Sequence, residues 1–142
     1  MSAKVTIKTS MRSEGQILAA LSAMGVPAEH ITHAPEGKQV RGYNRSRRGM
    51  AQVVIGKEWH GGYGDVGFAK QADGTYTVIM DDLDDRKLCR SLKIDKSARG
   101  KFAQMSGQWY AATTAKRTLQ QQGFTATIRQ DGVNLRVLAQ QY

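Results

Sequence analysis

The chain has 142 residues, of which 40% are hydrophobic, and it carries a formal net charge of +9 at pH 7. This length fits one domain that buries roughly two thirds of its unfolded surface, and the apolar share argues against wholesale disorder. No apolar run approaches the roughly 20 residues of a membrane span, and none follows the N-terminal lysines, so we expect neither a transmembrane helix nor a secretory signal.

The first quarter of the chain predicts a short strand followed by a helix. Residues 4–9 alternate polar and apolar side chains, as a half-buried strand does. Ser10 or Ser13 can then cap a helix by accepting a hydrogen bond from a free backbone N–H. Gly25 and Pro27 end that helix, because glycine adopts the left-handed conformation that helix ends favour. Its apolar stripe is Ile17, Leu18, Leu21 and Met24.

The middle of the chain predicts four strands. We expect a turn at Pro35–Lys38, an arginine-rich loop at Asn44–Gly49, a glycine-rich connection at Gly56–Gly64 and a tight hairpin turn at Asp73-Gly74. The strands between these turns are Gln39–Tyr43, Ala51–Ile55, Asp65–Lys70 and Tyr76–Met80.

The last third predicts a long helix and a hairpin. Apolar residues recur every three or four positions from Phe102 to Leu119, and Gly123 ends the pattern. Two strands follow, Thr125–Arg129 and Asn134–Ala139, with a turn at Asp131-Gly132. Because hairpins dominate, we expect a single α+β domain over residues 1–142, with a mostly antiparallel sheet and the two main helices on one face.

Four pieces of this pattern follow one another in a recognisable order. Val40–Tyr43 (VRGY) is the most specific, and it is followed by Val53–Ile55, Tyr63–Phe68 (YGDVGF) and Gln122–Phe124. In order and spacing they resemble the conserved plastid and cyanobacterial reading-frame family numbered thirty-five, a family of unknown function. The resemblance implies a compact single domain in which residues 41–43 belong to a common feature, and it implies no activity.

Two short stretches carry more than half of the positive charge. Twelve of the 21 Lys and Arg residues fall within them, and Asp95 is the one acidic residue that interrupts the second stretch. Because a local excess of cations raises a potential that recruits polyanions, this clustering indicates an anionic partner. The first run comprises Lys38, Arg41, Arg45, Arg47 and Arg48, and the second comprises Arg86, Lys87, Arg90, Lys93, Lys96, Arg99 and Lys101.

Aromatic residues lie beside the first basic run. Tyr43 precedes the arginine loop, and Trp59, His60 and Tyr63 follow it in the glycine-rich stretch. Basic side chains hold a phosphate backbone, and aromatic faces stack on unpaired bases. The sequence therefore predicts a small polyanion-binding protein, with RNA or single-stranded nucleic acid as the preferred ligand, although no standard recognition module is visible. The candidate contacts are Arg41, Tyr43, Arg45, Arg47, Arg48, Trp59, Lys87, Arg90 and Lys93.

Two other interpretations of these residues stay open. The arginines can form a solvated loop beside tyrosines that fill the sheet core, or the basic patches can dock on an acidic surface of a larger enzyme or ribonucleoprotein, as in an adaptor or inhibitor. A membrane surface is disfavoured, because the first basic run has no apolar helical face opposite its charges. An edge strand would allow dimerisation by strand pairing, but the sequence does not set the oligomeric state.

The residues with catalytic potential do not form a convincing site. Asp81, Asp82, Asp84 and Asp85 could hold Mg²⁺, yet neighbouring carboxylates on one turn point in different directions, so a surface cluster or helix N-terminal charges are expected. We therefore expect a protein that is not an enzyme and needs no cofactor, with metal-dependent chemistry at these aspartates as the alternative.

The histidines and the cysteine add no catalytic pattern. His30, His33 and His60 lack companions at zinc-site spacing. Cys89 is flanked by Leu88 and Arg90, which favours ordinary packing. As the only cysteine it also excludes an intrachain disulfide and favours a cytoplasmic protein.

Overall fold

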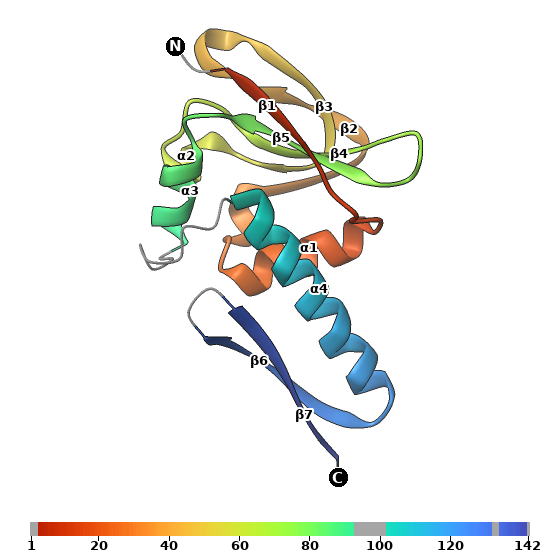
Figure 1. The fold of residues 1–142 in the computed structure, drawn as a ribbon. Coiled ribbons are helices and arrows are strands. Elements are labelled where there is room, and N and C mark those ends of the chain that lie inside the picture. The colour runs from red at the N-terminus through yellow and green to blue at the C-terminus, as the bar shows by residue number, and fades with distance from the viewer. Residues whose placement is uncertain (1–2, 93–101, 132–133, 142) are drawn as a thin grey trace.

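An antiparallel sheet of five strands forms the upper part of the molecule (Figure 1). The computed structural model describes residues 3–92, 102–131 and 134–141. Across the sheet the strand order is β1-β5-β4-β3-β2, so the two ends of the sheet are β1 and β2. The strands are β1 (Lys4–Lys8), β2 (Ile31–Arg41), β3 (Arg47–Ile55), β4 (Val66–Lys70) and β5 (Tyr76–Asp81).

Helices α1 (Glu14–Met24) and α4 (Phe102–Gln121) pack together on one face of this sheet. Ser13 caps α1 by accepting a hydrogen bond from the N–H of Gln16, and Gly25 ends it with a φ of 107°. The shared core joins apolar side chains of both helices to alternate residues of the strands, because alternate strand residues share one face. Its largest fully buried side chains are Phe68, Phe102, Ile17, Leu21, Ile55, Met80 and Leu88.

On the other face of the sheet, the β2–β3 hairpin bends over the neighbouring strand β4. Val40 of β2 and Ala51 of β3 lie so close to Gly67 of β4 that a Cβ there would stand 2.6 Å from Val40 and 2.8 Å from Ala51. These residues form a second small cluster with Val54, Ala69 and Ile79. Glycine at position 67 therefore lets the β2–β3 hairpin curl over its neighbour.

A second, two-stranded sheet lies at the far end of α4. It is a hairpin of β6 (Phe124–Asp131) and β7 (Asn134–Gln141), paired without interruption along its length. The hairpin packs on α4, which separates it from the five-stranded sheet (Figure 1). Two short helices, α2 (Lys57–His60) and α3 (Asp85–Ser91), lie side by side at one end of the larger sheet.

The α+β prediction is confirmed, with corrections in the middle of the chain. The turn predicted at Pro35–Lys38 is wrong: these residues lie inside β2, which accommodates them through a register shift between His33 and Lys38. The predicted Gly56–Gly64 connection contains α2. Gly132 of the predicted last turn lies outside the described residues. None of the described helices is long and apolar enough to cross a membrane.

Candidate nucleic-acid interface

Three segments that are distant in sequence meet beside α2. They are the loop 42–47, which joins β2 to β3 and includes the first residue of β3, the loop 61–65 after α2, and helix α3. The end of β2 and the second loop are in backbone contact: the N–H of Asp65 donates to the carbonyl of Arg41 at 2.8 Å. Gly64 makes this approach feasible, because a Cβ there would stand 2.8 Å from the Arg41 oxygen and 3.2 Å from the Gly42 Cα.

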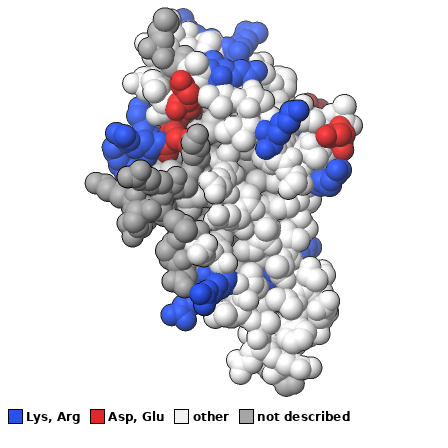
Figure 2. Space-filling view, in the orientation of Figure 1, with Lys and Arg blue, Asp and Glu red and all other residues white. Residues whose placement is uncertain are grey.

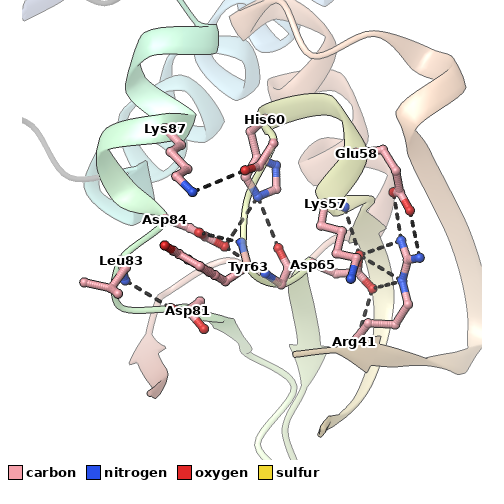
Figure 3. A network of polar contacts seen from close by, with 12 residues as sticks. Arg41, Lys57, Glu58, His60, Tyr63, Asp65, Asp81, Leu83, Asp84 and Lys87 are labelled. Atoms are coloured by element: carbon pink, nitrogen blue, oxygen red, sulfur yellow. Dashed lines mark hydrogen bonds and ion pairs between the residues drawn. The ribbon is translucent and has the colours of Figure 1, made fainter. Parts of the chain in front are cut away.

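The side chain of Arg41 is held by two carboxylates (Figure 3). Its Nε donates to Asp65 Oδ2 and its Nη2 to Asp65 Oδ1, both at 2.9 Å, and Asp65 is buried. Nη1 and Nη2 also contact the two oxygens of Glu58 at 2.8 Å. The hydrogen bonds to Glu58 and then Asp65 raise the pKa of Arg41, and Arg41 lowers the pKa of Glu58 to about 2. Arg41 is therefore a structural clamp.

Asp84 holds the loop 61–64 in place through hydrogen bonds to its backbone. Its carboxylate is fully buried and accepts hydrogen bonds from the N–H groups of Tyr63 at 2.9 Å and Gly64 at 3.0 Å. Burial alone would raise the pKa of Asp84, but the hydrogen bonds from His60, Tyr63 and Gly64 outweigh it and hold the pKa below its ordinary value. The loop conformation thus depends on an ionised aspartate.

His60 completes this anchor. Its ring is buried, and Nε2 lies 3.1 Å from the carbonyl of Gly64 and 3.5 Å from Asp84 Oδ2. Because a carbonyl only accepts, Nε2 must carry the proton. Nδ1 has no hydrogen-bond partner among the described residues. When the ring is neutral, the buried lone pair of Nδ1 therefore receives no hydrogen bond.

The other three aspartates of the acidic cluster are also engaged in structural contacts. Asp81 Oδ1 accepts from the N–H of Leu83, Asp82 Oδ1 from the N–H of Ala3, and Asp85 Oδ1 from the N–H of Phe102. The four carboxylates therefore diverge toward different elements. Within the described part of the chain, no group of three His, Cys, Asp or Glu residues is arranged to hold a metal ion.

Arg48 is also paired. Its Nη2 lies 3.4 Å from Asp81 Oδ2, and its side chain is only 14% exposed. The Arg48 side chain packs directly against Gly42, where a Cβ would stand 2.1 Å from Arg48 Nε. Nε itself is buried and without a partner among the described residues. Arg48 therefore packs the base of the loop 42–47.

Two exposed tyrosines cover the junction of the three segments. Tyr43 is 45% exposed and Tyr63 is 38% exposed, and their ring centroids are 5.4 Å apart in an edge-to-face arrangement. Lys87 of α3 lies over the Tyr63 ring, with Nζ 4.0 Å from the centroid, and also donates to the carbonyl of Gly61 at 3.3 Å. Each segment thus contributes one side chain to a single surface, here called the tyrosine surface (Tyr43, Tyr63 and Lys87).

Exposed cations lie on the same segments as the residues of the tyrosine surface. Arg45 and Arg47 are exposed on the same loop as Tyr43, and Arg86 and Arg90 are exposed on the same helix as Lys87. The loop 42–47 holds Asn44 at φ 54° and Arg45 at φ 63°, which is the left-handed region. Asparagine adopts this conformation readily, whereas arginine does so at a cost of about 1–2 kcal/mol.

A family model matches residues 20–135, and this span includes all three segments of the site. The model is described as a protein of unknown function, DUF1257. The chain belongs to this family. No curated protein matches the chain. No solved structure matches it either.

The predicted contacts of this DUF1257 member fall into four groups. Tyr43 and Lys87 belong to the tyrosine surface, and Arg45, Arg47 and Arg90 are exposed on the same segments. The guanidinium groups of Arg41 and Arg48 are instead occupied by carboxylates. Trp59 is half-buried against the main core. Lys93 lies outside the described residues, as do Lys96, Arg99 and Lys101 of the second basic run.

Sequence reasoning placed Tyr63 among the aromatic residues near the basic loop but not among the predicted contacts, and it missed the roles of Asp65 and Asp84. The available signal was the spacing of Gly61, Gly62 and Gly64 around Tyr63, since small residues there let the loop pack tightly against its neighbours. A Cβ on Gly62 would stand 2.3 Å from His60 Nε2 and 2.6 Å from Asp84 Oδ2. Asp84 could not be distinguished from its acidic neighbours by sequence alone.

The charges of this DUF1257 chain do not form one continuous patch on the face drawn in Figure 2. Lys and Arg side chains appear there as separate groups, and acidic side chains lie beside some of them. On this face the lower end, where Figure 1 places the C-terminal end of β7, is almost free of charge. Cys89 is half-buried, and burial raises the pKa of its thiol, which disfavours a reactive thiolate.

Proposed function

We propose that this protein is a small non-enzymatic binding protein whose tyrosine surface holds single-stranded nucleic acid, with RNA as the preferred ligand. The observation that carries the proposal is the contact between two exposed tyrosine rings, Tyr43 and Tyr63, beside exposed cations. Exposed aromatic rings are costly to leave in water, and unpaired bases are the partners that stack on them without regard to sequence.

Arg45 and Arg47 supply the electrostatic part of this interaction. Both are exposed on the loop that carries Tyr43, so a base stacked on Tyr43 brings its flanking phosphates within reach of two flexible guanidinium groups. Arg41 and Arg48 instead support the loop structurally, because their charges are already balanced by carboxylates. The candidate phosphate contacts of the first basic run are therefore Arg45 and Arg47.

The tyrosine surface rests on rigid supports. Asp84 ties the backbone of Tyr63, and Lys87 lies over the Tyr63 ring. On the other side, the N–H of Gly42 donates to the carbonyl of Ser46 at 2.7 Å and closes the loop. A preorganised surface loses little conformational entropy on binding, which favours a binding site over a merely solvated loop.

The direct test is a titration of a fluorescent 12-nucleotide RNA with the protein at several salt concentrations. We expect wild-type binding to weaken with rising salt, and the double variant Arg45→Ala/Arg47→Ala to bind more weakly with a slope of log K against log salt that is smaller by about 1.4. The matched control, Lys116→Ala/Arg117→Ala on α4, removes the same charge outside the three segments and should keep the wild-type slope.

Two results would overturn the proposal. One is wild-type protein that binds no single strand at low salt, and the other is a control variant that loses as much affinity as the loop variant. An acidic protein is the competing partner, because Tyr and Arg also dominate protein interfaces. A complex recovered from lysate that survives nuclease treatment would favour that adaptor or inhibitor function.

We also propose that the relationship extends to the plastid and cyanobacterial reading-frame family numbered thirty-five. The two most specific pieces of that resemblance, residues 40–43 and 63–68, are in backbone contact here through Arg41 and Asp65. A shared local structure would explain why both pieces occur together. A cytoplasmic location fits a chain with one cysteine whose thiol is half-buried.

A further inference from the structure

The two ends of the larger sheet are protected against pairing with another chain. The strand β1 has only five residues and carries Lys4 and Lys8. The strand β2 contains Pro35 and two register shifts, between His33 and Lys38 and between Gln39 and Arg41. Short strands, lysines, prolines and bulges are the devices with which sheet edges avoid other strands.

The strand β7 has none of these devices. Its eight residues, NLRVLAQQ, contain no proline, no lysine and no glycine, and all eight pair in unbroken register with β6. Among the described residues β7 pairs only with β6, so its second edge presents a row of unpaired backbone N–H and C=O groups. The hairpin packs on α4, and a third strand paired to this edge would also satisfy its unpaired backbone groups.

Apolar side chains accompany this open edge. Leu138 is 47% exposed on the face of the hairpin that points away from α4, and Leu135 and Val137 on the opposite face are only half-buried. Leu138 lies in the middle of the open edge strand. The same leucine on a strand that pairs with another copy would be covered.

The low charge of the hairpin allows a second copy of this chain to approach at this edge. The whole chain carries +9, so two molecules repel each other over most of their surfaces. The span 124–141 carries little net charge, with two arginines and one aspartate among its residues. The last five described residues of β7 carry no charge at all, and this end of the molecule is white in Figure 2.

We propose that β7 pairs antiparallel with β7 of a second copy, so that two hairpins form a four-stranded sheet and the protein is a two-fold dimer. The register that fits best places Leu138 opposite Leu138 of the second copy. Arg136 then lies opposite Gln140 of the second copy, which avoids a direct pair of like charges. This dimer does not depend on the nucleic-acid proposal, because the tyrosine surface is built from other elements.

The test is the molar mass in solution from light scattering, measured on nuclease-treated full-length protein in 0.5 M NaCl between 5 and 200 μM (about the range of weak to moderate dimers). We expect twice the mass of one chain at the upper concentrations. Leu138→Lys should give the single-chain mass throughout, because it places two ammonium groups at the two-fold axis. The control Thr6→Lys adds the same charge on the protected strand β1 and should remain dimeric.

A second measurement guards against a variant that fails to fold. Leu138→Cys should form an intermolecular disulfide on mild oxidation, because directly opposed strand residues have the Cα separation that a disulfide needs. Thr6→Cys should not, and both variants share the native Cys89. A wild-type protein that is monomeric at 200 μM (roughly the upper working range), a dimeric Leu138→Lys or a polydisperse aggregate would each contradict the proposal.

Discussion

Arg41 and the buried Asp65 are linked both through their side chains and through their backbones. Nε and Nη2 of Arg41 donate to the two carboxylate oxygens at 2.9 Å, and the backbone N–H of Asp65 returns a hydrogen bond to the carbonyl of Arg41 at 2.8 Å. The backbone N–H groups of Arg41 and Lys57 also donate to this carboxylate, each at 2.9 Å. One aspartate thus connects β2, α2 and β4.

Replacing Asp65 should therefore cost much more stability than replacing the second carboxylate on Arg41. We expect Asp65→Asn to lower the free energy of unfolding by roughly 3 kcal/mol, because a buried acceptor of several hydrogen bonds is lost. Glu58→Gln should cost less than about 1 kcal/mol, since Glu58 is 59% exposed and water replaces its contact. Urea denaturation of both variants decides this, and equal losses would contradict the assigned role of Asp65.

Asp84 should make stability depend on pH in acid. Its pKa in the folded protein lies below the ordinary value of 3.8. A depressed pKa contributes stability that is complete above the unfolded pKa and is lost as the pH falls through the folded pKa. We expect the stability difference between wild type and Asp84→Asn to be largest near neutral pH and to shrink below about pH 4. A difference that stays constant down to pH 2 (about the lower limit of Asp titration) would refute this contribution.

The main elements could be predicted because each has a local signal. The stripe from Ile17 to Met24 with Ser13 and Gly25 at its ends predicted α1, and Asp73-Gly74 predicted the β4–β5 turn. The turn expected at Pro35 was wrong because proline also fits a bulged edge strand, and whether β2 lies at an edge is a property of the whole sheet.

The candidate site was harder to predict than the fold. The basic loop and Tyr43 are visible in the sequence, but the pairing of Arg41 with Asp65 and of Arg48 with Asp81 joins residues 24 and 33 positions apart. A count of charges along the sequence does not show which arginines are paired with carboxylates. Only the folded chain distinguishes arginines that balance buried carboxylates from Arg45 and Arg47, which remain exposed.

Two glycines should respond to alanine in opposite directions. Gly64→Ala brings a Cβ within 2.8 Å of the Arg41 carbonyl oxygen, a rigid backbone atom, and should destabilise the protein by about 1–3 kcal/mol. Gly107 lies inside α4 with open space around it, so Gly107→Ala should stabilise the protein by about 0.5–1 kcal/mol. Thermal denaturation checks both, and a harmless Gly64→Ala would contradict the tight contact between the two loops.

Arg45 should separate stability from binding. Its left-handed backbone favours glycine, so Arg45→Gly should leave the free energy of unfolding unchanged or raise it by up to about 1 kcal/mol. The same variant should bind single-stranded RNA more weakly, because an exposed guanidinium is lost. Denaturation and RNA titration of one preparation give both numbers. A variant that loses stability but not affinity would show that Arg45 supports the fold only.

The most direct test of the tyrosine surface is an NMR titration of isotope-labelled protein with a short single-stranded RNA. The account predicts that the largest changes in chemical shift occur in the ring signals of Tyr43 and Tyr63 and in the amide signals of residues 42–47, 61–65 and 85–91, with α4 and the β6–β7 hairpin little affected. Saturating RNA that leaves both tyrosine rings unchanged, or that shifts signals elsewhere instead, would contradict it.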